Sequence, residues 1–196
     1  MSADNTPWQA ALSLADLGRL TGDWLAGRLD YHPGHPDGAL DLGPAEIIDL
    51  LVAINRCGMV TLVAQTGLDE RDGDGVPVRW RHPAVWALLA DKDLPRLNSA
   101  FTDVHLYEQS AIPRLTWHRK RVRAGYDVTW FRDRRFDAPI GRDMHTRDLR
   151  RWFGGQLSRS ALAEASAAWQ VVLIGRDAAD TELWRGLKRF AATAGK

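Results

Sequence analysis

Positive charge is concentrated in residues 114–151, and this segment holds the side chains best suited to bind an anion. It carries twelve Arg or Lys residues against five Asp, whereas residues 1–113 carry eight basic and sixteen acidic residues. The formal net charge of +1 for the whole chain therefore conceals a strongly asymmetric distribution. Such a basic segment predicts a negatively charged partner.

One residue of the basic segment has the right chemistry for proton transfer at neutral pH. We expect His118 to act as a general acid or base if the segment forms a catalytic pocket, with Asp127 as its partner across a hairpin. Arg119, Arg121 and Arg147 would then hold a phosphate or carboxylate group through bidentate hydrogen bonds. The simpler alternative is that His118 is a solvated residue of a strand.

Polar residues also follow two predicted strands. Gln65, Thr66 and Gly67 come directly after one apolar run, and Asp177 follows another. Ligands of open α/β sheets collect beyond the carboxyl ends of strands, so parallel neighbouring strands would bring these residues to one rim. In the alternative interpretation, Gly67 only permits a turn, and Asp177 or Asp180 only caps the last helix.

Aromatic side chains lie among the cations of the basic segment. Trp117 is surrounded by Arg and Lys residues, and Trp130 is followed by Phe131 and three arginines. Aromatic rings can stack bases while guanidinium groups bind phosphates, so a nucleic-acid-binding module is one alternative function. Neither face of this hairpin is apolar throughout, and we therefore expect it to project beyond the core or to form a sheet edge.

The preferred interpretation is a domain that binds an anionic small molecule, similar to a nucleotide or a carboxylate, with or without enzymatic activity. The polar strand ends and the basic hairpin can converge on one pocket, whereas a sequence pI of about 8.0 is modest for a nucleic-acid-binding protein. A third alternative is structural. In that case the acidic residues of 1–113 pair with the arginines inside the fold or across a homo-oligomer, without any ligand.

The motifs that would indicate a metal or a cofactor are weak. His32 and His35 are each followed by a proline, which favours a turn over a metal site. Residues 70–75 resemble the start of a calcium loop, but Arg81 stands where the bidentate Glu is required. Cys57 is expected in the core, and the chain has no glycine-rich phosphate loop. We therefore predict no metal and no cofactor.

The elements that position these residues follow from the apolar periodicity. Ser13 and Asp16 form the pattern of a capping box at the start of an amphipathic helix. Predicted helices cover residues 13–26, 44–57, 158–168 and 180–192, and a short helix is predicted to begin at Pro83. Predicted strands cover residues 59–64, 76–80, 102–107, 114–123, 126–132 and 169–174, of which the first and last are expected in the sheet interior.

Helices and strands alternate at both ends of the chain around a strand-rich middle. This order predicts an α/β fold, with α+β as the alternative, in which a mixed sheet with a parallel crossover is flanked by helices. The length predicts a single domain, residues 1–196, with the basic hairpin segment at about 114–151. The longest apolar run, residues 84–90, is too short to span a membrane, and the single cysteine fits a reducing compartment. We expect a cytoplasmic protein without membrane contact.

Four stretches resemble the motifs of a family of small bacterial domains, of the actinobacterial type, with no known function. They are residues 14–27, 55–67, 152–159 and 169–184. The chain has Ala64-Gln65-Thr66-Gly67 where the family pattern closes Ser-Gln-Pro-Gly, and Gly175-Arg176-Asp177 where the family carries an Asp-Pro pair. The resemblance implies a shared fold and no particular activity.

Overall fold

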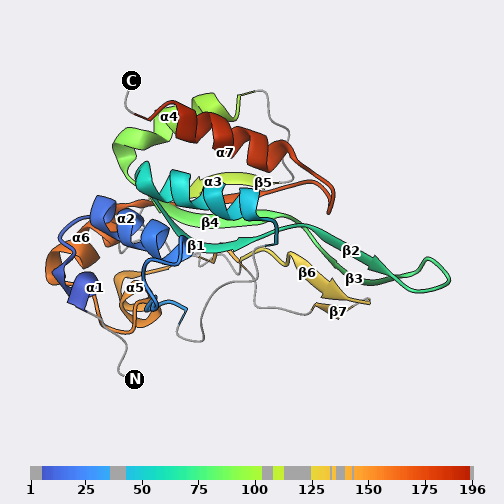
Figure 1. Ribbon diagram of the computed structural model, residues 1–196, viewed down its shortest axis with the longest axis horizontal. Coiled ribbons are helices and arrows are strands. Elements are labelled where there is room, and N and C mark those ends of the chain that lie inside the picture. Colours follow the sequence, from blue (N-terminus) through green and yellow to red (C-terminus); the bar gives the residue numbers. More distant parts are fainter. Residues whose placement is uncertain are drawn as a thin grey trace.

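A four-stranded antiparallel sheet lies at the centre of the molecule (Figure 1). The computed structural model describes residues 6–35, 43–102, 108–112, 125–132, 134–135, 140–142 and 144–194. The strand order is β1-β4-β8-β5, formed by Met59–Gln65, Ala84–Leu89, Trp169–Ile174 and Glu108–Ile112. Because successive side chains of a strand point to opposite faces, each buried strand contributes to two hydrophobic clusters.

Strand β4 shows this division most clearly, since all of its residues are buried. Trp86 and Leu88 belong to the cluster on one face, whereas Ala87 and Leu89 belong to the cluster on the other. In β1 the alternation is shifted by a β-bulge at Leu62, which lies between the paired residues Thr61 and Val63. Both faces of the sheet are therefore covered, as in a three-layer arrangement.

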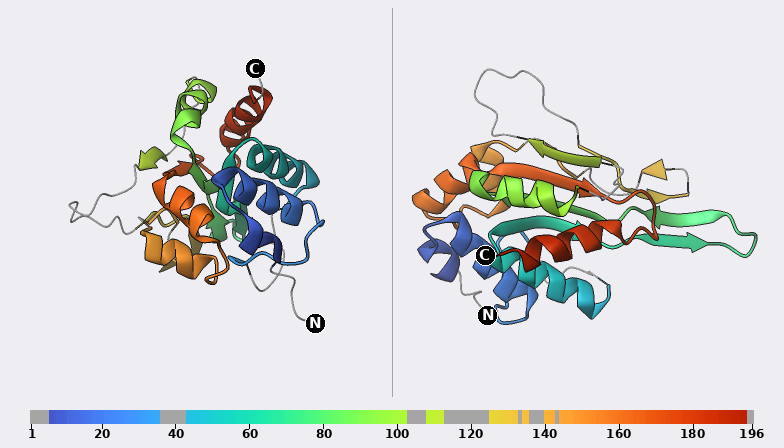
Figure 2. Two further views of the ribbon diagram at one scale, coloured as in Figure 1. Left: turned by 90° about the vertical axis from the view of Figure 1, so that its left-hand side faces the viewer. Right: turned by 90° about the horizontal axis from the view of Figure 1, so that it is seen from above.

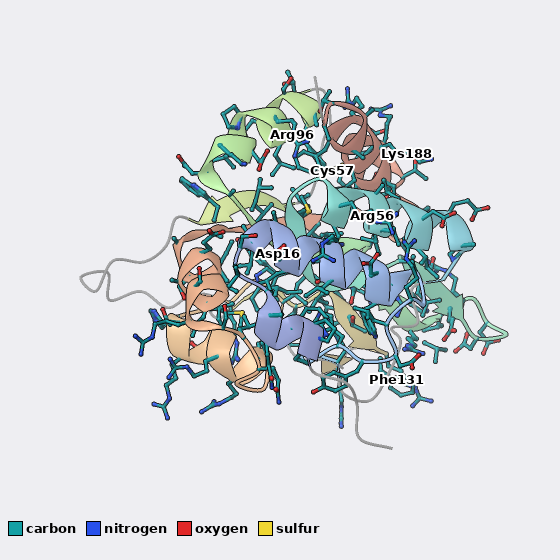
Figure 3. All side chains as sticks on the ribbon, turned by 60° about the vertical axis from the view of Figure 1, so that its left-hand side comes forward. Asp16, Arg56, Cys57, Arg96, Phe131 and Lys188 are labelled. Carbon is teal, nitrogen blue, oxygen red and sulfur yellow. The ribbon has the colours of Figure 1, made fainter. Side chains whose placement is uncertain are left out.

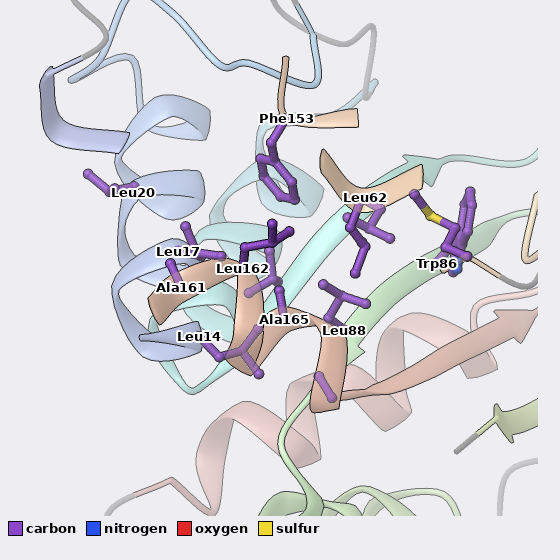
Figure 4. Close-up of a cluster of buried hydrophobic side chains, with 14 of the residues drawn as sticks. Leu14, Leu17, Leu20, Leu62, Trp86, Leu88, Phe153, Ala161, Leu162 and Ala165 are labelled. Atoms are coloured by element: carbon purple, nitrogen blue, oxygen red, sulfur yellow. The ribbon is translucent and has the colours of Figure 1, made fainter. Parts of the chain in front are cut away.

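Helices cover the two faces in separate groups. Helices α3 (Ala45–Arg56), α4 (Leu94–Ala100) and α7 (Glu182–Ala192) cover one face, together with the short 3₁₀ helix at Asp91–Asp93. Helices α1 (Thr6–Ala10), α2 (Leu14–Leu25), α5 (Thr146–Trp152) and α6 (Arg159–Ala167) cover the other. Figure 4 shows this second cluster, where leucines of α2 meet Ala161, Leu162 and Ala165 of α6.

A second antiparallel sheet extends from the body of the molecule (Figures 1 and 2). Its strand order is β2-β3-β6-β7, formed by Leu68–Arg71, Pro77–Arg81, Thr129–Phe131 and Arg134–Arg135. β2 follows β1 after two residues and β3 leads into β4, so the two sheets share one long hairpin ribbon. Residues 129–131 of the predicted basic hairpin form β6, between β3 and β7 of this second sheet. Residues 114–123, the other half of that hairpin, lie outside the described part of the chain, so its projection beyond the core stays a prediction.

The α/β class and the flanking helices are confirmed, but the pairing of the strands differs from the expected mixed sheet. Every strand pair among the described residues is antiparallel. The predicted helix after Pro83 is wrong, because residues 84–89 form β4. A short, wholly apolar run has no period that separates a buried strand from a buried helix, and here partner strands on both sides decide the outcome.

The expectation of two interior strands is confirmed for β8 and not for β1. β8 lies between β4 and β5, whereas β1 is the outermost strand of the described sheet. β1 is nevertheless largely buried, because α2 packs on it and the His35 side chain binds the carbonyl oxygen of Leu62. Among the described helices, none has the length and apolar character needed to cross a bilayer.

Candidate functional site

The loops after β1 and β8 leave the central sheet at the same end, where both strands finish. Gln65, the last residue of β1, and Ile174, the last residue of β8, both pair with Ala84 of β4. β1 and β8 therefore run in the same direction, although β4 separates them. The predicted meeting of the two polar loops is found, with a different strand arrangement from the one expected.

The two loops form a shallow groove of about 390 Å³, lined by Gly67, Leu68, Asp69, Asp177, Ala178 and Ala179. The loop backbones are in contact, since a Cβ atom on Gly67 would collide with the carbonyl oxygen of Ala178. A glycine is thus required here by close approach.

Gln65 and Thr66 serve as structural links at the junction of the two sheets. The Gln65 side-chain amide donates to the carbonyl oxygen of His82 at 2.7 Å and, more weakly, to that of Val128 at 3.4 Å. The Thr66 hydroxyl accepts a hydrogen bond from the Arg81 guanidinium at 3.2 Å. Both polar groups are therefore already occupied by the protein.

The carboxylates after β8 also bind the protein itself. The Asp177 carboxylate accepts from the backbone N–H of Ala179 at 3.0 Å, and Asp180 accepts from those of Arg176 and Glu182 at 2.7 and 2.8 Å. Burial raises the pKa of Asp180, but these backbone N–H bonds outweigh it and hold the pKa below its usual range. The loop donors are thus occupied and the groove is acidic, which makes it a poor site for an anion.

A buried histidine that the sequence analysis did not select lies beside this junction. His82 is 8% exposed, and its ring lies edge-on to Trp80 and Trp130 at 5.2 and 5.8 Å. Burial lowers the pKa of His82, opposed by a hydrogen bond with the Gly175 backbone and by Asp177 and Asp180. Its alternation with Trp80 along the strand is the sequence signal that points to this placement.

Of the residues proposed from the basic segment, Asp127 and Arg147 are described, and neither lines this groove. His118, Arg119 and Arg121 lie outside the described residues. Asp127 is half-buried and forms an ion pair with Arg135 at 3.0 Å, at the base of the second sheet. Arg147 lies on α5, which packs on α6 away from the β2–β3 hairpin (Figure 1).

Helix α5 presents a row of arginines. Arg147, Arg150 and Arg151 occupy one exposed face because they are three and four residues apart, while Leu149 points into the core. Nitrogen-tipped side chains extend outward from this region in Figure 3. Among the described residues, none of the three has a carboxylate within ion-pair distance.

The first residue of α6 completes a small pocket beside this row. Arg150 and Arg159 line it together with Gly155, Leu157 and Leu162, and its volume is about 190 Å³. The walls are fixed: the Gly155 N–H donates to the Arg150 carbonyl oxygen at 2.8 Å, and the Ser158 hydroxyl caps α6 by accepting from Ala161 at 3.1 Å.

The nearest acidic side chains of these helices are occupied by backbone groups. Asp148 accepts from the backbone N–H of His145 at 3.0 Å, and Glu164 accepts from that of Leu14 at 2.7 Å. Two arginines that line one pocket without such partners are the residue type that binds phosphate or carboxylate.

The two histidines of the predicted turn are held by structural hydrogen bonds. His32 Nδ1 accepts from the Gly34 N–H at 3.0 Å, and His35 Nε2 donates to the Leu62 carbonyl oxygen at 3.0 Å. Within the described ranges, no group of three His, Cys, Asp or Glu side chains converges as metal ligands would.

Comparison with known families places the chain among proteins without an assigned activity. The model of a family described as a domain of unknown function (DUF6919) matches residues 3–194. The chain belongs to this family. The resemblance to a family of unknown function is thereby confirmed, and the match covers almost the whole chain. A search of the curated proteins found no match.

Since membership assigns no chemistry, function has to be inferred from the residues. Sequence reasoning selected Arg147 but missed Arg150 and Arg159. The spacing of Arg147, Arg150 and Arg151 is visible in the sequence, whereas the approach of Arg159 depends on the tight turn through Gly154 and Gly155, both at positive φ.

Proposed function

We propose that this domain binds an anionic small molecule, with a phosphate or carboxylate group held between Arg150 and Arg159. The observation that carries the proposal is the pair of arginines lining one pocket, with no described carboxylate within ion-pair distance of either. Arg147 and Arg151 add positive potential at the mouth, which attracts anions from solution.

The pocket volume restricts how much of a ligand can be enclosed. Pockets that bury a drug-sized ligand measure roughly 300–1,000 Å³, compared with about 190 Å³ here. The pocket therefore suits one anionic group, while the rest of the ligand extends along the surface. Leu157 and Leu162 provide apolar contact next to that group.

The lining favours binding over catalysis. None of its five residues supplies a nucleophile or a group that transfers protons near neutral pH. A cytosolic location forms part of the proposal, because the single cysteine, Cys57, is free and half-buried, as expected in a reducing compartment.

The test is thermal melting at low ionic strength with inorganic phosphate, pyrophosphate and citrate, each against matched sodium chloride. Binding to the folded state raises the melting temperature. At a ligand concentration about one hundred times Kd, the free energy of unfolding increases by about 2.7 kcal/mol. Arg150→Gln and Arg159→Gln should each weaken binding about 10- to 150-fold, since a hydrogen bond to a charged group contributes about 1.5–3 kcal/mol.

Arg185→Gln is the matched control, because Arg185 is exposed and paired with Glu182 on α7. It should leave the ligand response unchanged. Equal responses of Arg150→Gln and Arg185→Gln would refute the proposed site, as would no response of the native protein to any of the three anions. A variant that dissociates an oligomer in light scattering would instead support the structural alternative.

A further inference from the structure

The register of the second sheet places an aromatic side chain between two arginines. Glu70 pairs with Arg79, Arg79 with Phe131, and Phe131 with Arg134, so these four residues form one row across the four strands. Directly opposed residues of paired strands point to the same face. Phe131 therefore has an arginine on each neighbouring strand.

Phe131 is exposed, unlike most large apolar side chains of the described chain. Its exposed fraction is 43%, and it is the aromatic member of the exposed group that also contains Leu12 and Val76. The guanidinium carbon of Arg132 lies 5.8 Å from the centre of its ring. Figure 3 shows Phe131 at the outer side of the molecule.

The opposite face of the same strands holds the sheet in place. Trp80 and Trp130 are cross-strand partners whose rings stack at 3.9 Å with an interplanar angle of 5°. Arg135 lies on this face as well, and it is already paired with Asp127. Arg134, on the Phe131 face, has no carboxylate within ion-pair distance among the described residues.

We infer that the face formed by Arg79, Phe131 and Arg134 binds single-stranded nucleic acid. The exposed ring offers a surface on which an unpaired base can stack, and the arginines on the two neighbouring strands supply positive charge for the phosphates. The bases of a duplex are stacked on each other and cannot reach the ring. A single exposed aromatic residue is also too little apolar surface for a protein interface.

This inference is independent of the pocket at α5 and α6, which lies on different elements. The test is fluorescence anisotropy of labelled single-stranded DNA and RNA of about 10 nucleotides at low salt. Phe131→Leu keeps an apolar side chain in the sheet but removes the aromatic face, and it should weaken binding at least about fivefold. Phe131→Tyr keeps the ring and should bind as the native protein does.

Replacement of Arg134 tests the phosphate contact separately. Arg134→Gln should lower the dependence of log Kobs on log salt by about one unit. Two matched controls should bind like the native protein: Val76→Ala, at the exposed tip of the same sheet, and Arg150→Gln, in the other pocket. Near-ultraviolet circular dichroism of the stacked tryptophans verifies that each variant keeps the second sheet folded.

Four outcomes would overturn the inference. In the first, the native protein does not bind single strands; in the second, a folded Phe131→Leu variant binds them as tightly as the native protein does. In the third, duplex and single strand bind with equal affinity. In the fourth, polyglutamate binds as tightly as the single-stranded oligonucleotide. The last two would show attraction by charge alone. Because Arg150→Gln impairs only phosphate-induced stabilisation, failure of the oligonucleotide test and failure of the anion pocket can be told apart.

Discussion

Acid should destabilise this protein through His32. The side chain is fully buried, and the rings of Trp8 and Trp24 lie 4.6 and 4.7 Å from its own. Burial, with a smaller effect of His35, lowers the pKa of His32 from 6.5 to about 3. No charged carboxylate contacts the ring among the described residues, so the folded state holds His32 neutral.

The sign and size of the effect follow from proton linkage. The unfolded chain binds a proton at His32 near pH 6.5, whereas the folded chain does so only near pH 3. The contribution of His32 to stability therefore falls as the pH is lowered from 6.5 to 3 and is constant above pH 6.5. One pKa unit corresponds to about 1.36 kcal/mol. From pH 7 to pH 5, His32 alone should therefore lower the free energy of unfolding by about 2 kcal/mol.

Urea denaturation at pH 7, 6 and 5 measures this change. His32→Asn removes the titration and keeps an oxygen that can accept from the Gly34 N–H, so it should lose about 2 kcal/mol less than the native protein over the same interval. The carboxylates with lowered pKa values, Asp16 and Asp180, destabilise only at more acidic pH and do not interfere.

Trp24→Phe is the control, because it loosens the same cluster without removing a titrating group. It should lower stability at every pH and retain the native pH dependence. His35 and His82 also have lowered pKa values and add to the acid sensitivity of all three proteins alike. Identical pH dependence of His32→Asn and the native protein would refute the reasoning, since a neutral buried His32 requires the difference.

Two further substitutions test the junction of the sheets. Gly67→Ala should lower the free energy of unfolding by about 1–3 kcal/mol in thermal melts, because its Cβ collides with the Ala178 backbone. The control is Gly73→Ala, whose Cβ meets no atom within 4 Å and which should be nearly neutral. Gln65→Leu leaves the His82 carbonyl oxygen without its side-chain donor and should lower stability by about 1–3 kcal/mol in urea denaturation. The exposed Gln9→Leu should change it by no more than about 0.5 kcal/mol, and equal effects of the two Gln variants would contradict the structural role of Gln65.

The elements with a clear period were predictable from the sequence. The capping box at Ser13 and Asp16 is present at the start of α2, and β8 has the predicted bounds. Periodicity reports which side chains are buried, so it fails where burial is uniform. Residues 84–89 are apolar on every side, and only the neighbouring strands determine that they form β4.

The candidate sites were harder to predict because they depend on contacts between distant segments. The meeting of the loops after β1 and β8 was anticipated from an incorrect parallel pairing, and it occurs because both strands flank β4. The pocket of Arg150 and Arg159 requires α5 and α6 to be joined by a tight turn, and no local pattern specifies which arginines then face each other.

The described ion pairs bear directly on the structural alternative for the basic segment. Where acidic residues of the amino-terminal part form described ion pairs, their partners are arginines of that same part: Asp23 binds Arg19, Arg28 and Arg56, and Asp93 binds Arg96. The described ion pair within residues 114–151 joins Asp127 to Arg135, both from that segment.

These described ion pairs therefore each stay within one part of the chain. They do not extend from the acidic amino-terminal part to the arginines of α5, whose excess charge is left facing solvent. Exposed arginines without an ion-pair partner contribute little to stability, so the fold itself does not require their accumulation on one helix, whereas the proposed anion site does.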